Sequence, residues 1–137
     1  MPAYYADSSA LLKLIVDEPE SGALLEYVRG ARLVSCELAL TEVPRAVQRR
    51  LVSEPDTPVE ALLNDAEELL DELPLLPLEA ELLTFAAALP EPALRSLDAI
   101  HLAAAIELAP LDAFVTYDVR QAAAARLSGL RTVAPGT

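Results

Sequence analysis

Apolar residues along the chain fall into short runs separated by longer segments with helical periodicity. A short apolar run bounded by polar residues, proline or glycine is typical of a buried strand. The predicted strands are Ala3–Ala6, Arg32–Ser35, Leu75–Leu78, Ala113–Thr116 and Arg131–Val133.

The segments between these runs place apolar residues three and four positions apart, which predicts helices. Leu62, Ala66 and Leu69, for example, share one face of their segment. Pro44 lies inside the long segment Glu37–Val52 and is expected to bend that helix. The predicted helices are Ser8–Val16, Ser21–Arg29, Glu37–Val52, Thr57–Leu73, Glu79–Ala88, Ser96–Leu108 and Val119–Ser128.

Strands and helices thus alternate along the chain, and no pair of strands is joined by a two-residue hairpin turn. This order predicts an α/β fold with a mostly parallel central sheet. In such sheets, ligands bind at the carboxyl ends of the strands, near the point where strand order reverses. The residues that directly follow strands are therefore the first candidates for a functional site.

Four acidic residues stand at such informative places. Asp7 and Asp118 follow predicted strands, Asp98 opens an apolar helix, and Glu42 lies beside Pro44. Carboxylates that converge on one edge of a sheet repel each other unless a cation lies between them. Oxygen ligands without histidine or cysteine favour magnesium or manganese.

Each acid also has a local structural interpretation. Asp7 and Asp118 can act as N-caps of the helices that follow them. Asp98 stands in a first helical turn, where the helix dipole favours an acid, and Glu42 can be a solvated helix position. Position alone leaves both interpretations open.

The chain has 137 residues, which suits one domain, and its formal net charge is −12. This charge argues against a basic module that grips nucleic acid by counterion release. It does not exclude a nuclease, because bound cations reverse the local field. All but one of the ten basic residues are arginines, and Arg45, Arg49 and Arg50 lie close together. They are either weak candidates for RNA contacts or an ordinary solvated helix face.

The only cysteine is Cys36, so an internal disulfide is impossible. The first residues lack the basic and apolar regions of a targeting segment. Charged residues interrupt every window of about 18 residues that would be long enough to span a membrane. We therefore expect a cytoplasmic protein without a membrane span.

Four local sequences match a known family in order along the chain: DSSALLKL at Asp7, TEV at Glu42, LDAIHLAAA at Asp98 and FVTYD at Asp118. Together they resemble the PIN domain and, within it, the VapC-type toxins of bacterial toxin–antitoxin operons. The most specific part is LDAIHLAAA, followed about twenty residues later by TYD. The resemblance covers nearly the whole chain and implies a single PIN-like nuclease domain over residues 1–137.

The resemblance implies a three-layer α/β/α sandwich around a mostly parallel sheet. It implies metal binding by Asp7 and Asp98, with Glu42 and Asp118 completing an acidic catalytic pocket. Thr116 would orient Asp118 or a bound water, and Ser9 would support Asp7. His101, the only histidine, belongs to the packing pattern of its helix.

The activity implied is that of a Mg²⁺-dependent endoribonuclease, with Mn²⁺ as a possible substitute, leaving 5′-phosphate and 3′-hydroxyl ends. The resemblance also implies a structured RNA substrate such as transfer or ribosomal RNA, a cognate antitoxin and a homodimer. The apolar helices within Leu11–Val28 and Val59–Leu73 offer surfaces for such partners, or simply cover the sheet.

Three other interpretations were weighed. A receiver-type phosphoacceptor domain needs a lysine after its last strands, but the only lysine is Lys13. A haloacid-type phosphatase needs a second acid two residues after Asp7, where Ser9 stands instead. A non-catalytic PIN module that only binds is disfavoured by the intact acids, although the sequence leaves it open.

Overall fold

The computed structural model describes residues 1–137 and contains one five-stranded sheet. The strand order is β3-β2-β1-β4-β5, and every neighbouring pair is parallel. The predicted α/β class with a parallel sheet is therefore confirmed. The strands are β1 (Ala3–Ala6), β2 (Arg32–Cys36), β3 (Leu75–Leu76), β4 (Ala113–Val115) and β5 (Thr132–Val133).

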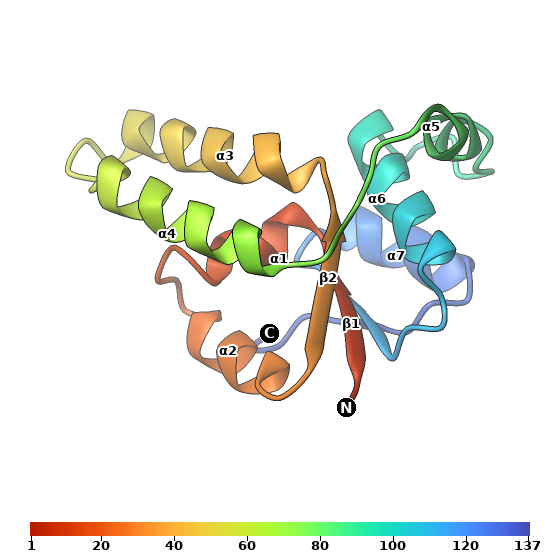
Figure 1. Cartoon of the computed structure of the whole chain (residues 1–137), viewed down its shortest axis with the longest axis horizontal. Coiled ribbons are helices and arrows are strands. Elements are labelled where there is room, and N and C mark those ends of the chain that lie inside the picture. The colour runs from red at the N-terminus through yellow and green to blue at the C-terminus, as the bar shows by residue number, and fades with distance from the viewer.

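Seven helices form the two outer layers of an α/β/α sandwich. Figure 1 shows α1 to α4 gathered on one side of the sheet and α5 to α7 on the other. The helices that connect the parallel strands therefore cover both faces of the sheet, as parallel sheets require. The helices are α1 (Ser8–Lys13), α2 (Ser21–Val28), α3 (Ala39–Ser53), α4 (Val59–Glu72), α5 (Ala80–Ala87), α6 (Ser96–Glu107) and α7 (Val119–Leu127).

Alternate residues of the central strands belong to two separate cores. Tyr5 and Phe114 pack with α5, α6 and α7, whereas Tyr4 and Ala6 pack with α1 to α4. Successive side chains of a strand point to opposite faces, so a strand covered on both faces must be apolar at nearly every position. This explains why these strands appear in the sequence as continuous apolar runs.

Two predicted elements extend two or more residues past the C-terminal end that the structure gives them. The first helix ends at Lys13 rather than Val16, and the Ser21 hydroxyl donates to the Val16 carbonyl in the turn that follows. The third strand contains only Leu75–Leu76, and Pro77, which follows it, has no backbone N–H to continue the ladder.

The strand order reverses at β1, since β2 and β3 lie on one side of it and β4 and β5 on the other. The ends of β1 and β4 are adjacent, with Ala6 opposite Val115 and the Asp7 N–H donating to the Val115 carbonyl. The residues after these two strands therefore meet at the switch point of the sheet. None of the helices combines the length and apolar character needed to cross a bilayer.

Candidate active site

One pocket at the switch point collects all four acids that the sequence singled out. It has a volume of about 300 Å³ and is lined by Asp7, Ser8, Ser9, Leu12, Glu42, Ala46, Arg49, Asp98, His101 and Asp118. The acids come from four different places in the chain: the end of β1, α3, the first turn of α6 and the residue before α7. The fold thus brings together side chains up to 111 positions apart, counting from Asp7 to Asp118.

Asp7 is 4% exposed, and both of its carboxylate oxygens accept hydrogen bonds. Oδ1 accepts from the Ser9 hydroxyl at 2.6 Å and the Ala10 N–H at 3.2 Å, and Oδ2 accepts from the Thr116 hydroxyl. Burial raises the pKa of Asp7, although the bonds from Ser9 and Thr116 oppose that shift. Asp7 is therefore an N-cap of α1 and a pocket acid at once.

Glu42 is half-buried and is fixed through a single oxygen. Its Oε1 accepts from the Ser8 hydroxyl at 2.7 Å and lies 2.7 Å from His101 Nε2. Burial alone would raise the pKa of Glu42, but the bonds from His101 and Ser8 lower it. Glu42 is thus held as a carboxylate at the wall of the pocket.

His101, which the sequence assigns to the packing pattern of its helix, also lines the pocket and contacts Glu42. It is 2% exposed, and Nδ1 lies 2.7 Å from the Tyr5 hydroxyl. Burial lowers its pKa, yet hydrogen bonds to Cys36 and Glu42 outweigh burial and raise that pKa. The sequence carried one signal: His101 stands three residues after Asp98 and so shares its helix face.

Asp98 and Asp118 present oxygens with few protein partners. The Asp98 side chain accepts no hydrogen bond from the protein, while Asp118 accepts from the N–H groups of Arg120 and Gln121 through Oδ1 only. Burial, followed by the charges of Asp118 and Asp7, raises the pKa of Asp98. The Thr116 hydroxyl, besides donating to Asp7, accepts from the Asp118 N–H.

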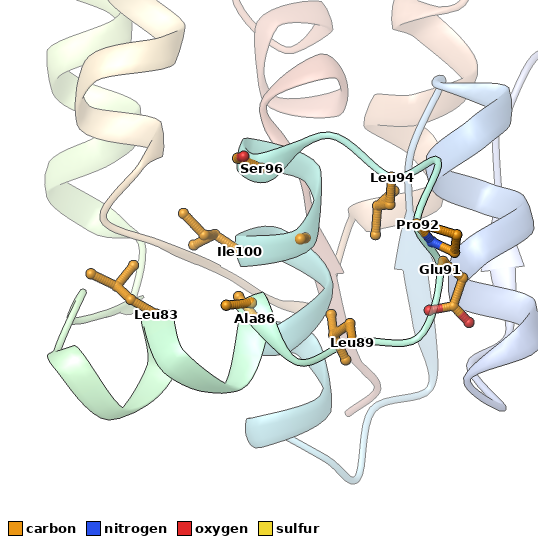
Figure 2. A pocket seen from close by; sticks show the side chains of 10 residues that line it. Leu83, Ala86, Leu89, Glu91, Pro92, Leu94, Ser96 and Ile100 are labelled. Carbon is orange, nitrogen blue, oxygen red and sulfur yellow. The ribbon is translucent and has the colours of Figure 1, made fainter.

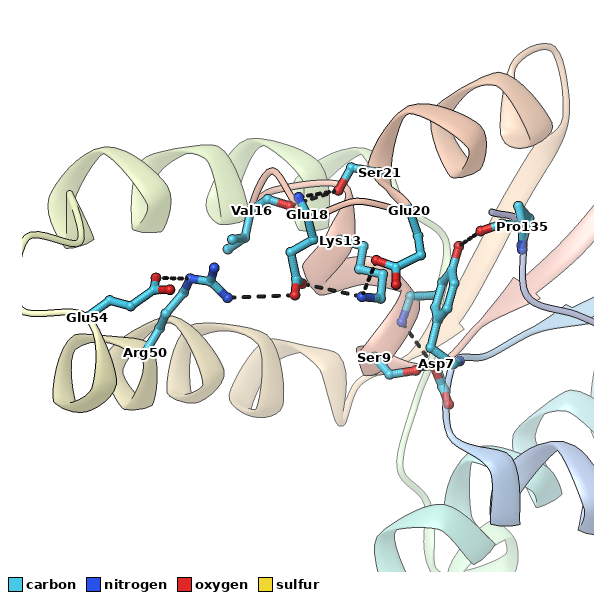
Figure 3. A network of polar contacts seen from close by, with 12 residues as sticks. Asp7, Ser9, Lys13, Val16, Glu18, Glu20, Ser21, Arg50, Glu54 and Pro135 are labelled. Atoms are coloured by element: carbon cyan, nitrogen blue, oxygen red, sulfur yellow. Dashed lines mark hydrogen bonds and ion pairs between the residues drawn. The ribbon is translucent and has the colours of Figure 1, made fainter. Parts of the chain in front are cut away.

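The three neighbouring arginines of α3 have different surroundings. Arg49 lines the acidic pocket, whereas Arg45 and Arg50 do not. Arg50 forms ion pairs with Glu18 and Glu54, which Figure 3 shows in line with Lys13. Only Arg49 is therefore placed to contact a group bound beside the acids.

A second cavity, of about 280 Å³, lies between α5 and α6 (Figure 2). Most of its lining is apolar, and Glu91 is its single acid. Charged chemistry on a phosphodiester requires several polar groups that converge on one point. The acidic pocket meets that requirement and this cavity does not.

The acidic pocket suits a hydrated divalent ion. The carboxylate oxygens that accept no hydrogen bond are both oxygens of Asp98, Oε2 of Glu42 and Oδ2 of Asp118. Asp7 Oδ2 accepts only from Thr116 and keeps a lone pair that an ion can use. No three His, Cys, Asp or Glu side chains are grouped closely enough to hold an ion by themselves. Magnesium commonly takes one or two carboxylates and completes its shell with water and substrate phosphate, so these residues fit that mode of binding.

Fold and pocket together define an α/β protein of the PIN-domain class, and the PIN domain family matches residues 4–127. The chain is 41% identical to Ribonuclease VapC35 of Mycobacterium tuberculosis over 138 residues, covering 96% of each chain. It is also 41% identical to Ribonuclease VapC46 of that organism, covering 98% of this chain and 99% of the relative. The chain therefore belongs to the PIN-domain family, within the group of VapC ribonuclease toxins.

Solved structures show the same fold. The VapC20 toxin of Mycobacterium tuberculosis, described as cleaving the sarcin-ricin loop, superposes with a TM-score of 0.71 at 16% identity, covering 96% of this chain and 99% of that one. VapBC2 of Rickettsia felis, solved with a DNA fragment from its promoter, gives a TM-score of 0.68 at 15% identity, covering 97% and 98%. The three-layer PIN architecture implied by the sequence motifs is thus confirmed.

Proposed function

We propose that this protein is a Mg²⁺- or Mn²⁺-dependent endoribonuclease and the toxin of a toxin–antitoxin pair. One observation carries the proposal: four carboxylates from separate elements line one pocket at the switch point of a VapC-family fold. In this proposal Asp7 and Asp98 hold the ion, and Glu42 and Asp118 complete the catalytic set.

A bound divalent ion supplies charge neutralisation at the scissile phosphate and lowers the pKa of a nearby water. Thr116 and Ser9 fix both oxygens of Asp7 and so set its orientation in the pocket. Glu42 and Asp118 present free oxygens that can orient the attacking water and accept its proton. The water attacks phosphorus in line with the bond from phosphorus to the 3′ oxygen. That bond breaks, and the departing 3′ oxygen takes up a proton, so the products carry a 5′-phosphate and a 3′-hydroxyl.

RNA is the proposed substrate, in a structured form such as transfer or ribosomal RNA. With a net charge of −12, the protein cannot hold RNA by a broad basic surface. Arg49 and the metal site must supply local contacts instead. Exposed bases in RNA loops offer the shape-based recognition that such a site can use.

The proposed partners are a cognate antitoxin and a second copy of the chain. An antitoxin that blocks the site has to cover a strongly acidic pocket. Charge complementarity therefore favours a basic segment on the antitoxin. The solved VapBC2 complex, a toxin with its antitoxin, supports this type of pairing.

The deciding experiment is cleavage of total RNA by the purified chain with Mg²⁺ or Mn²⁺, with EDTA, and with Asp98→Asn. Loss of the metal's charge stabilisation is worth several kcal/mol, so we expect cleavage to fall by about 100-fold or more. Asp71→Asn, the same change on an exposed position of α4, serves as the control and keeps full activity. Metal-independent cleavage, or an active Asp98→Asn protein, contradicts the proposal; no cleavage by any folded form favours a binding module.

A further inference from the structure

A buried polar cluster lies on the core side of Glu42. It consists of Tyr5 from β1, Ser8 from α1, Cys36 from β2 and His101 from α6. Tyr5, Cys36 and His101 are all at most 2% exposed. Such polar groups are costly to bury unless each finds a partner, so their hydrogen bonds determine what the cluster does.

The partners in this cluster fix the direction of the bonds. Glu42 Oε1 is a carboxylate oxygen and can only accept, so His101 Nε2 carries a proton and donates to it at 2.7 Å. This holds for the imidazolium and for the neutral tautomer whose Nδ1 accepts from the Tyr5 hydroxyl at 2.7 Å. His101 is therefore held at both ring nitrogens, and its orientation is set from the core side by Tyr5.

Ser8 donates to the same oxygen. Its hydroxyl lies 2.7 Å from Glu42 Oε1 and 3.3 Å from His101 Nε2, so the three groups form a closed triangle. Glu42 Oε2 accepts no hydrogen bond from the protein. Two donors on one oxygen fix the plane of the carboxylate and leave the other oxygen for a ligand of the pocket.

We propose that His101 and Ser8 are positioning residues that hold Glu42 by Oε1 and thereby offer only Oε2 to the divalent ion and its water. The inference rests on the proposed function of the pocket and adds to it a specific role for two residues outside the acidic set. Neither residue has to touch the RNA, because each acts through Glu42.

A role limited to packing makes a different prediction. A core histidine needs a partner for each nitrogen, but it does not need a second donor to converge on the same carboxylate oxygen. The Ser8 bond is also the informative one, because Ser8 is only partly buried at the first turn of α1. Removing its hydroxyl leaves the core intact and changes only the support of Glu42.

The test uses Ser8→Ala, His101→Leu and His101→Gln in the full-length protein. Leu102→Ala, a fully buried position on the same helix, controls for general loss of packing. Three quantities are measured: the Kd for Mn²⁺ by electron paramagnetic resonance without RNA, kcat and KM for RNA cleavage, and the thermal midpoint.

Supporting residues of metal ligands typically contribute 10–100-fold to metal affinity or activity. We expect Ser8→Ala and His101→Leu to raise the Mn²⁺ Kd and lower kcat by about 10-fold or more, with KM within about 2-fold. His101→Gln, whose amide N–H can replace the Nε2 donor, recovers most of the loss. Leu102→Ala lowers the thermal midpoint but keeps the Kd and kcat of the wild type.

Wild-type Kd and kcat in both Ser8→Ala and His101→Leu overturn the inference while leaving the proposed function in place. Equal losses in His101→Leu and Leu102→Ala, without an effect of Ser8→Ala, also overturn it, because packing then explains the result. A wild-type protein that neither binds Mn²⁺ nor cleaves RNA refutes the proposed function itself, and the inference with it.

Discussion

Among the pocket acids, Asp7 receives the most hydrogen bonds and Asp98 receives none from the protein. A carboxylate with fixed oxygens is pre-organised for a ligand, whereas an unsupported one must find its position when the ligand arrives. The two acids proposed to hold the ion thus differ in rigidity. Removal of a side chain that donates a hydrogen bond to Asp7 is accordingly expected to lower both RNA cleavage and the stability of the fold.

Thr116→Val removes the hydroxyl that donates to Asp7 Oδ2 while nearly keeping the side chain's shape. We expect RNA cleavage to fall by about 10–100-fold and the free energy of unfolding to fall by about 1–3 kcal/mol, because a buried acceptor loses its partner. Ser35→Ala, which removes a buried bond to the Ala6 carbonyl, is the control. It should cost stability without a comparable loss of cleavage; equal cleavage losses would refute a specific role for Thr116.

Arg49 and Arg45 stand one helical turn apart on α3, but only Arg49 lines the pocket. Replacing Arg49 by Met removes a cation from the pocket proposed to take the scissile phosphate and keeps the aliphatic stem. We expect kcat/KM for RNA to fall by about 10-fold, the equivalent of one charged hydrogen bond. Arg45→Met should change it by less than about 2-fold, and similar effects of both variants would show a diffuse charge effect instead.

At the scale of elements, the order of strands and helices could be predicted because each strand is covered on both faces and each helix has an apolar stripe. The ends of elements could not, since distant partners set them. The Val16 carbonyl, for example, accepts a hydrogen bond from the hydroxyl of Ser21, which belongs to the next helix. Asp7 and Asp118 could be placed together because strand ends in parallel sheets share an edge, whereas Glu42, inside a helix, was singled out by the family resemblance.

The contacts among the site residues could not be predicted from the sequence either, because they join residues that are far apart along the chain. His101 and Glu42 are 59 positions apart, and no local pattern reports that their side chains meet. The stripe Glu42, Ala46 and Arg49 does follow helical spacing. That stripe could have singled out Arg49 from its two neighbours, because all three of its members line the pocket.

Lys13 ties α1 to the turn before α2. Its Nζ donates to Glu20 Oε2 at 3.1 Å, lies 3.5 Å from Glu18 Oε1 and stands 4.9 Å from the centre of the Tyr117 ring. Figure 3 shows this group continuing through Glu18 to Arg50 on α3. The network thus joins α1 and α3, which both line the acidic pocket, through the turn before α2.

The hydrogen bond from Lys13 lowers the pKa of Glu20 below its ordinary 4.5. A lowered folded-state pKa contributes stability that is present above pH 4.5 and is lost as the pH falls through the folded value. We expect Lys13→Met to lower the urea midpoint at pH 7, and the gap from wild type to narrow in acid. Arg29→Met, which breaks an exposed pair with Glu26, should have little effect; a gap independent of pH would contradict the role of Glu20.

For the whole molecule, a net charge of −12 and an acidic pocket make the metal-free state self-repelling. The charges of Asp118 and Asp7 add to burial in raising the pKa of Asp98. Ionisation of Asp98 therefore opposes folding until a cation is bound. The carboxylates that serve the proposed chemistry therefore reduce the stability of the fold when no cation is bound.

Mg²⁺ or Mn²⁺ at ten times its Kd should stabilise the fold by about 1.4 kcal/mol, or about 3–5 °C in the thermal midpoint. NaCl at equal ionic strength separates this binding from general screening. Asp98→Asn should melt higher than wild type in EDTA and gain less from the metal. Equal gains from NaCl and the divalent ions would show that no specific site exists.

The position of β1 in the middle of the sheet has a consequence for fragments of the protein. Its neighbour β4 begins at Ala113, far along the chain from β1, and Asp118 follows that strand. A fragment that stops before Ala113 has one edge of β1 unpaired and lacks one acid of the pocket. On the proposed function, a fragment that stops before Ala113 is therefore inactive, and RNA cleavage requires both β4 and the acid that follows it.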